Sequence, residues 1–212
     1  MSFSVELLTL ICLHNPFKAG DVLSKVLLHI CCGPCASYPV PVLREQGYEV
    51  MGYFFNPNIH PYTEYQKRKE ALEQYAENVD LKVIYDEKYN PVEYFQNIAY
   101  REAQRCRLCY TMRLEQAAHI ARKGKFDSFT TTLLVSKYQK HNQIREVGEA
   151  MGAKYGVPFL YQDFRTGFAE TGVRSREMGL YRQQYCGCLY SEIERYAPRD
   201  LSREIFKMGD AK

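Results

Sequence analysis

The chain has 212 residues, of which 46% are hydrophobic and 25% are charged, a composition that excludes intrinsic disorder and predicts one domain or slightly more. No run of 18 apolar residues is present, which excludes a membrane-spanning helix, and the apolar N-terminus lacks the basic start and the cleavage site of a secretory signal. The net charge of +3 is too small to predict a nucleic-acid partner by itself. We therefore expect a cytoplasmic protein with no membrane partner.

Short apolar runs alternate with helical patterns along the chain. The predicted strands are 25–30, 48–55, 81–85, 128–134 and 157–161. The predicted helices are 36–46, 62–78, 91–100, 107–123 and 138–155. This alternation predicts an α/β fold, with a mostly parallel sheet and helices on both faces. We expect residues 1–24 to be an N-terminal extension and 25–212 to be a single domain, whose helical C-terminal segment from Arg174 folds back over it.

Seven of the eight cysteines fall in three motifs, CCGPC, CRLC and CGC, and only Cys12 stands alone. The seven are Cys31, Cys32, Cys35, Cys106, Cys109, Cys186 and Cys188. We interpret Cys12, on an apolar stretch, as a small buried hydrophobic residue. Without an export signal, clustered cysteines indicate metal binding or redox chemistry rather than structural disulfides.

The cysteine motifs follow strands or begin helices in this scheme. CCGPC comes directly after the first predicted strand, at the edge where open α/β sheets bind ligands, and a helix N-terminus there favours thiolates. Cys106 and Cys109 are three residues apart and share one face of a helix turn. Intervals of 70 and 76 residues separate the motifs, far more than in a zinc finger. The ligands must therefore converge from three parts of the fold.

Three kinds of chemistry could use these thiols. A structural zinc site needs only four of them, and a thioredoxin-like dithiol centred on CGPC needs neither CRLC nor CGC. An iron–sulfur cluster with further thiolates left over accounts best for seven. If the backbone is extended at Cys31 and Cys32, their side chains point in opposite directions and could serve different ions. No nucleotide-binding motif follows a strand, so any electrons come from outside.

Four segments in a fixed order carry a family resemblance: LLHICCGPCASYPV, FNPNIHPYTEYQKRKE, RCRLCYTMRL and SREMGLYRQQYCGC. Together they resemble QueH, the cobalamin-independent epoxyqueuosine reductase family, from about residue 25 to residue 190. The resemblance implies an adenine-nucleotide-hydrolase-like, Rossmann-like fold that holds a [4Fe-4S] cluster. It also implies that the substrate is tRNA with epoxyqueuosine in its anticodon loop, which the enzyme reduces to queuosine at the wobble position.

This reaction matches the residues. Removing an epoxide oxygen as water consumes two electrons and two protons, and a cluster can pass electrons singly from an external low-potential donor of the ferredoxin or flavodoxin type. Seven thiolates leave room for a second, mononuclear iron that binds the oxygen as a Lewis acid. Two other functions stay open: an iron–sulfur tRNA thiolation enzyme, whose Ser-Gly-Gly-x-Asp-Ser turn is missing, and a zinc-stabilised RNA-binding protein.

Other candidate residues are less distinctive. Asp163, after the fifth predicted strand, is either an iron ligand, a proton donor or only a helix cap paired with Arg165. His60 could face the same pocket or be a structural histidine, and Tyr138 and Tyr185 could contact the modified base or simply pack.

A basic segment supports an RNA partner better than the net charge does. Residues 101–145 hold ten Lys and Arg against three acids. Arg174, Arg176 and Arg182 add further cations just before CGC. Such residues can neutralise phosphates, although a solvated helix face remains the alternative. The expected tRNA contacts are Arg105, Arg107, Lys137 and Lys140.

Overall fold

The structure is a computed structural model that describes residues 23–86, 88–201 and 204. Most of the expected N-terminal extension, including Cys12, lies outside the described residues. None of the helices in the described part of the chain has both the length and the apolar content needed to cross a membrane.

The sheet has four parallel strands in the order β3-β2-β1-β4. They are β1 Ser24–His29, β2 Tyr48–Phe54, β3 Val83–Tyr85 and β4 Ser128–Thr131. The central strand β1 is a continuous apolar run, and its Val26, Leu27 and Leu28 are fully buried. A strand reads in this way when helices cover both faces of the sheet, so the predicted α/β class is confirmed.

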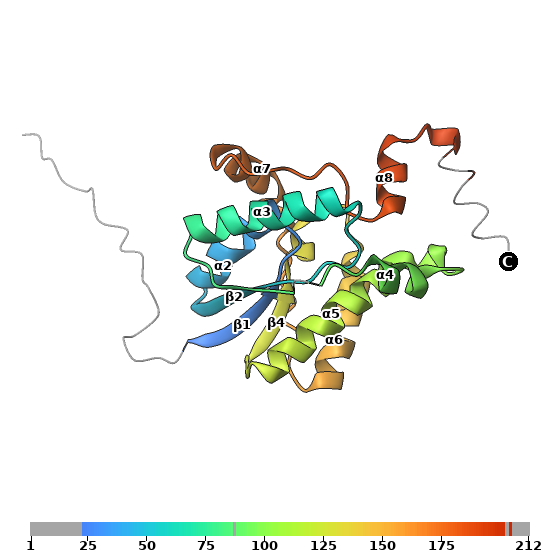
Figure 1. Cartoon of the computed structure of the whole chain (residues 1–212). Helices are drawn as coiled ribbons and strands as arrows, with labels where there is room; N and C mark the ends of the chain where they lie inside the picture. The colour runs from blue at the N-terminus through green and yellow to red at the C-terminus, as the bar shows by residue number, and fades with distance from the viewer. Residues whose placement is uncertain (1–22, 87, 202–203, 205–212) are drawn as a thin grey trace, which may run out of the picture.

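Helices cover both faces of this sheet (Figure 1). They are α1 Gly33–Ala36, α2 Pro39–Glu45, α3 Tyr62–Asn78, α4 Pro91–Ile98, α5 Arg105–Lys123, α6 His141–Tyr155, α7 Phe168–Glu177 and α8 Leu189–Tyr196. Short 3-10 turns occupy Glu102–Gln104, Thr132–Val135 and Arg165–Gly167. On one face α2 packs on β2 and α3 on α1, whereas on the other α5 packs on β1 and β4 and α6 lies beside α5.

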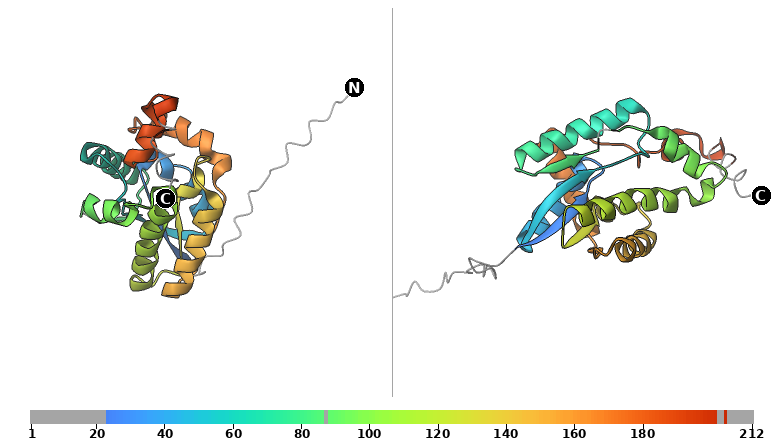
Figure 2. Two further views of the ribbon diagram at one scale, coloured as in Figure 1. Left: turned by 90° about the vertical axis from the view of Figure 1, so that its right-hand side faces the viewer. Right: turned by 60° about the horizontal axis from the view of Figure 1, so that its bottom comes forward.

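The strand order places a crevice where the cysteines lie. Because β1 is the first strand and β4 joins its other edge, the crossovers leave β1 and β4 in opposite directions, and α/β sheets bind ligands at such a switch point. The left view of Figure 2 looks onto this edge, where the strands end at His29 and Thr131. Nδ1 of His29 lies 2.9 Å from Oγ1 of Thr131, a contact that closes the floor of the crevice.

Several predicted boundaries are wrong, each for a local reason. Residues 157–161 form only an isolated parallel bridge between Phe159 and Phe129, where Pro158 has no N–H to extend a ladder. The predicted helix 36–46 is divided into α1 and α2 because Pro39 cannot donate to the preceding turn. The strand predicted over 128–134 ends at Thr131, whose side chain accepts a hydrogen bond from Leu133 N at 3.2 Å and starts a 3-10 turn.

The helical C-terminal segment also differs from the prediction. It starts at Phe168 rather than Arg174, and after α7 the chain has no regular structure until Leu189. This irregular stretch carries the CGC motif.

Candidate metal and active site

The CCGPC motif gathers three sulfurs at the end of β1. The sulfurs of Cys31, Cys32 and Cys35 all lie within 4.8 Å of one another, and those of Cys31 and Cys32 are 3.7 Å apart. Gly33 lets α1 approach α3 closely, since a Cβ there would lie 2.2 Å from the carbonyl oxygen of Ala71. We call these three cysteines the thiol triad.

The prediction that Cys31 and Cys32 point in opposite directions is wrong. β1 ends at His29 and the chain bends at Cys31, so the alternation of a strand no longer applies there. Both sulfurs therefore face the same point, an arrangement that suits one shared ion.

The triad holds one thiolate more easily than three. Hydrogen bonds from Cys32 and Cys35 hold the pKa of Cys31 well below its usual value. Burial raises the pKa of Cys32, and the hydrogen bonds to Cys31 and Cys32 raise that of Cys35. Like charges this close cannot all ionise without a cation between them. A metal ion would therefore displace protons from Cys32 and Cys35.

The CRLC and CGC motifs meet beside the triad, and we call their four cysteines the second thiol group. Cys106 and Cys109 lie in the first turn of α5, as predicted. Cys109 and Cys188 are buried in one small cluster with Tyr94 and Ile98 of α4. Burial raises the pKa of Cys109 to about 12, so its thiol is neutral unless a cation binds it.

The CGC loop is fastened by its backbone and by neighbouring amides. Gly187 has a φ of 137°, which favours glycine, and its carbonyl accepts a hydrogen bond from His60 N at 2.8 Å. The sulfur of Cys188 caps α8 by accepting from Ser191 N at 3.4 Å. The sulfur of Cys186 accepts from Nε2 of Gln139 at 3.2 Å.

Arg113 lies buried between the two sets of cysteines. Its guanidinium donates to Asn56 Oδ1 at 2.7 Å and to the sulfur of Cys109 at 3.9 Å, and its Nε lies 3.3 Å from Nε2 of His29. Among the described residues, no carboxylate forms an ion pair with it. Burial opposes its charge, but the thiolates of Cys109 and Cys31 raise the pKa of Arg113 above its usual value. The cysteines thus provide its counter-charge.

His29 does not add a charge to this environment. Burial lowers the pKa of His29 to about 3, so its imidazole is neutral at physiological pH. Arg113 is therefore the cation that faces the buried thiols from α5.

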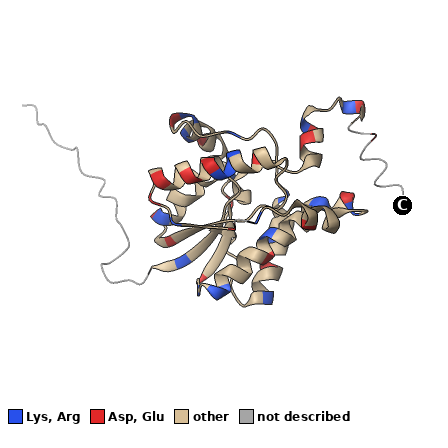
Figure 3. Ribbon diagram, viewed as in Figure 1, with Lys and Arg blue, Asp and Glu red and all other residues tan. Residues whose placement is uncertain are grey.

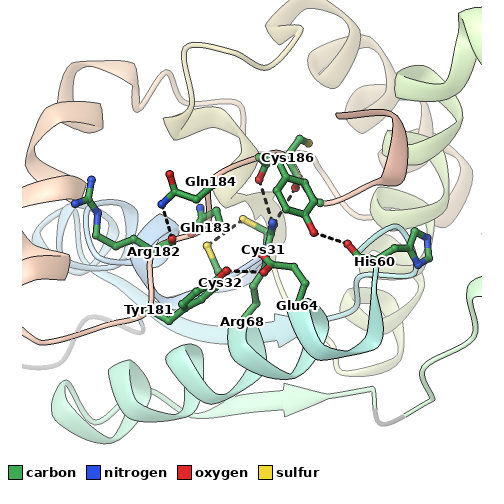
Figure 4. A network of polar contacts seen from close by, with 12 residues as sticks. Cys31, Cys32, His60, Glu64, Arg68, Tyr181, Arg182, Gln183, Gln184 and Cys186 are labelled. Carbon is green, nitrogen blue, oxygen red and sulfur yellow. Dashed lines mark hydrogen bonds and ion pairs between the residues drawn. The ribbon is translucent and has the colours of Figure 1, made fainter. Parts of the chain in front are cut away.

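Arg68 of α3 holds the C-terminal segment over the triad (Figure 4). Its guanidinium donates to the carbonyls of Cys186 at 2.8 Å and Tyr185 at 3.0 Å, and to Glu64 Oε1 at 2.7 Å. Nε2 of Gln183 donates to the sulfur of Cys35 at 3.2 Å. The segment that carries CGC is thereby joined both to α3 and to the triad.

The structure places the other predicted site residues around these cysteines rather than among them. His60 is buried, its Nδ1 lies 3.0 Å from Tyr89 Oη, and burial lowers the pKa of His60 to about 4. Its backbone carbonyl accepts from Tyr185 Oη at 2.5 Å, so the backbone rather than the ring borders the CGC loop. Tyr138 is 77% exposed and packs edge-on against Phe168.

Asp163 is paired with Arg165. Its Oδ1 accepts from Arg165 N at 3.0 Å, and hydrogen bonds from the Arg165 side chain lower the pKa of Asp163 to about 2. No contact in the described part of the chain joins it to a cysteine. Its role as a ligand or an acid stays a prediction.

The four basic residues expected to contact tRNA are in part already engaged. Arg105 forms an ion pair with Glu194 of α8, and Arg107 pairs with Glu146 of α6 at 2.8 Å. Lys137 lies 5.3 Å from the ring centre of Tyr138. Acidic and basic side chains alternate along this part of the surface (Figure 3). A phosphate would have to compete with these pairs.

Sequence reasoning did not identify Arg68 or Arg113 as site residues. A signal for Arg113 exists, because it follows Cys109 by four residues and so shares its helix face. Arg68 lies within QKRKE, a pattern that is typical of a solvated helix.

Comparisons with known proteins agree with one another. The family model described as "Epoxyqueuosine reductase QueH" matches residues 26–194. Proteins described by the same words are 40% identical over 172 residues in Dehalococcoides mccartyi (81% of this chain, 94% of that protein) and 38% identical over 183 residues in Thermotoga maritima (82% and 93%). A third, from Haemophilus influenzae, is 35% identical over 188 residues (84% and 76%).

One solved structure was also found to align. It is described as a predicted subunit of tRNA methyltransferase from Methanocaldococcus jannaschii, with 14% identity, a TM-score of 0.49, and coverage of 87% of this chain and 89% of that chain.

Proposed function

Because the chain belongs to the QueH family of epoxyqueuosine reductases, we propose that it is an oxidoreductase that reduces epoxyqueuosine to queuosine at the wobble position of tRNA. The observation that carries this proposal is the meeting of seven cysteines from three distant motifs at the switch point of the sheet. The reaction breaks two C–O bonds of the epoxide, forms a C=C bond and releases water, at the expense of two electrons and two protons.

The donor set fits iron. The triad sulfurs lie close enough to share one ion, whereas a cluster spreads its ligands over several irons, as the second thiol group would allow. We therefore assign a [4Fe-4S] cluster to Cys106, Cys109, Cys186 and Cys188. The single iron is assigned to the triad.

The buried Arg113, which has only thiolates as anionic partners, supports the assignment because it requires negative charge in the native state. When bound, the iron centres supply low-potential electrons and a Lewis acid for the epoxide oxygen. Those electrons would come from an external low-potential donor of the ferredoxin or flavodoxin type.

The residues of the chain have separate tasks in this proposal. Arg113 and Arg68 hold positive charge beside the thiolates, and Arg68 also fixes the segment that bears Cys186. Because hydrogen bonds from Arg165 lower the pKa of Asp163 to about 2, Asp163 is ionised at neutral pH. It is therefore better suited to act as a metal ligand or a base than to donate a proton.

The test is anaerobic purification followed by iron, zinc and sulfide analysis, and then single-turnover reduction. The metal-loaded protein is mixed with reduced ferredoxin and tRNA that contains epoxyqueuosine, and the nucleosides are analysed by mass spectrometry. We expect bound iron in excess of sulfide and a nucleoside lighter by one oxygen atom. Zinc without sulfide would contradict the iron–sulfur assignment, and an iron-loaded protein that leaves epoxyqueuosine unchanged would contradict the function.

A further inference from the structure

An aromatic pocket lies on the flank of the cysteine site. It has a volume of about 500 Å³ and lies between the first turns of α3 and the loop that joins β3 to α4. The lining residues are Tyr62, Tyr65, Gln66, Lys69, Lys88 and Tyr89. Its volume falls within the range of small-ligand sites, about 300–1,000 Å³. We call it the tyrosine pocket.

The rings of the pocket are held in place by one another. Tyr65 is only 5% exposed, its ring centre lies 4.9 Å from that of Tyr89, and its hydroxyl donates to the carbonyl of Asp86 at 3.2 Å. Tyr62 stacks on Tyr65 with an interplanar angle of 19°, yet Tyr62 is 51% exposed. An exposed aromatic face on a rigid base is the surface on which single-stranded nucleic acids stack their bases.

The charge of the pocket favours an anionic ligand. Two lysines and no acidic side chain line it, and Lys88 is exposed. The glutamates Glu70, Glu73 and Glu77 lie farther along α3, whose acidic end is at the left in Figure 3. Gln66, whose amide contacts the Tyr62 hydroxyl, can offer both a donor and an acceptor to the edge of a base.

The pocket is joined to the cysteine site through His60. The His60 ring contacts Tyr89 from behind, and its backbone bonds to Gly187 and Tyr185 on either side of Cys186 (Figure 4). A ligand in the pocket therefore lies beside the loop that carries CGC. The two sites can hold different nucleotides of one RNA strand.

From this geometry we infer that the tyrosine pocket binds one nucleotide of the substrate tRNA, other than the one that is reduced. This inference rests on the proposed function for the identity of the RNA. The base stacks on Tyr62, Gln66 contacts its edge and Lys88 neutralises its phosphate. The pocket thus helps to position the anticodon loop over the cysteines.

The experiment measures binding of epoxyqueuosine-containing tRNA to the metal-loaded protein by fluorescence anisotropy at several salt concentrations. Tyr62→Ala should weaken binding by about 5- to 150-fold, whereas Tyr62→Phe, which keeps the stacking face, should bind like the unaltered protein. Lys88→Gln should reduce the magnitude of the slope of log K against log salt by about 0.7. Iron content verifies that each variant is folded.

Matched controls lie at the opposite edge of the sheet. Tyr155→Ala, at the end of α6, and Lys123→Gln, at the end of α5, should leave affinity and salt slope unchanged. A second arm titrates the protein with free AMP and UMP, because a free nucleotide has the same chemistry as a nucleotide of the RNA.

The outcomes separate this inference from the proposed function. If the Tyr62→Ala and Lys88→Gln variants bind tRNA normally while the unaltered protein reduces epoxyqueuosine, the pocket is not an RNA site and the function stands. If AMP or UMP binds in a Tyr62-dependent way while tRNA affinity is unaffected, the pocket serves a free nucleotide and the inference is wrong. If the unaltered protein does not bind tRNA, both fail.

Discussion

Replacing Arg113 by methionine removes the buried cation between the two sets of thiols while approximately preserving the packing of the side chain. In the metal-loaded protein this leaves the thiolate ligands without their nearest positive charge, and it leaves Asn56 Oδ1 without its 2.7 Å donor. Removing one member of a buried ion pair costs about 3–5 kcal/mol. In the metal-free protein the loss is smaller, because burial raises the pKa of Cys109 to about 12 and keeps that thiol neutral.

The difference between the two states appears as metal affinity. We expect Arg113→Met to weaken metal binding by roughly 10²- to 10³-fold, since each 1.4 kcal/mol is tenfold. The assay is a competition titration with a chelator, with denaturant unfolding of the metal-free and metal-loaded proteins as the second measurement. Arg113→Lys, which keeps the charge but not the planar fork, should recover part of the affinity. Equal destabilisation of both states by Arg113→Met would refute the idea that Arg113 balances the thiolates.

Other changes test the remaining assignments. Cys186→Ser and Cys188→Ser should each lose cluster iron and turnover, and full activity in both would refute the convergence of the three motifs. Asp163→Asn should bind tRNA with an unchanged salt slope but lose single-turnover reduction; normal reduction would leave it only its partner Arg165. Because burial lowers the pKa of His60 to about 4 in the folded protein, the unfolded chain binds the extra proton below pH 6.5, and the free energy of unfolding should fall by about 2 kcal/mol between pH 6.5 and 5. His60→Phe should flatten this dependence in urea unfolding, and an unchanged slope would assign it elsewhere. Neutralising four basic residues should reduce the magnitude of the tRNA salt slope by about 0.7 for each phosphate that the variant no longer neutralises, and should leave the metal content intact, whereas normal binding with failed reduction would place them in the active site. These four are Arg105, Arg107, Lys137 and Lys140.

The parts of the fold that depend on local pattern could be predicted from the sequence. The boundaries of α3, 62–78, agree with the prediction because its start and end are set by neighbouring residues. The run 157–161 looked like a strand, since an apolar stretch does not reveal whether a neighbouring strand pairs with it. Local composition predicts propensity, and pairing partners are decided by the whole sheet.

The candidate site divides in the same way. The three cysteine motifs are visible because thiols are rare and chemically distinctive. The buried arginines were not recognised, because an arginine on a helix is usually solvated and only the packing of distant segments reveals that Arg68 and Arg113 are 1% exposed. The relative directions of Cys31 and Cys32 also depend on a bend that no pattern marks.

The position of the CGC motif along the chain gives the protein an order of maturation. Cys186 and Cys188 are synthesised after all four strands, and Arg68 of α3 waits in the folded domain to receive their loop. A nascent chain can therefore complete its sheet and thiol triad while half of the second thiol group is still absent. The full ligand set exists only after the last motif has left the ribosome and docked, so insertion of the complete metal centre is by construction a late step, reserved for chains whose domain has already folded.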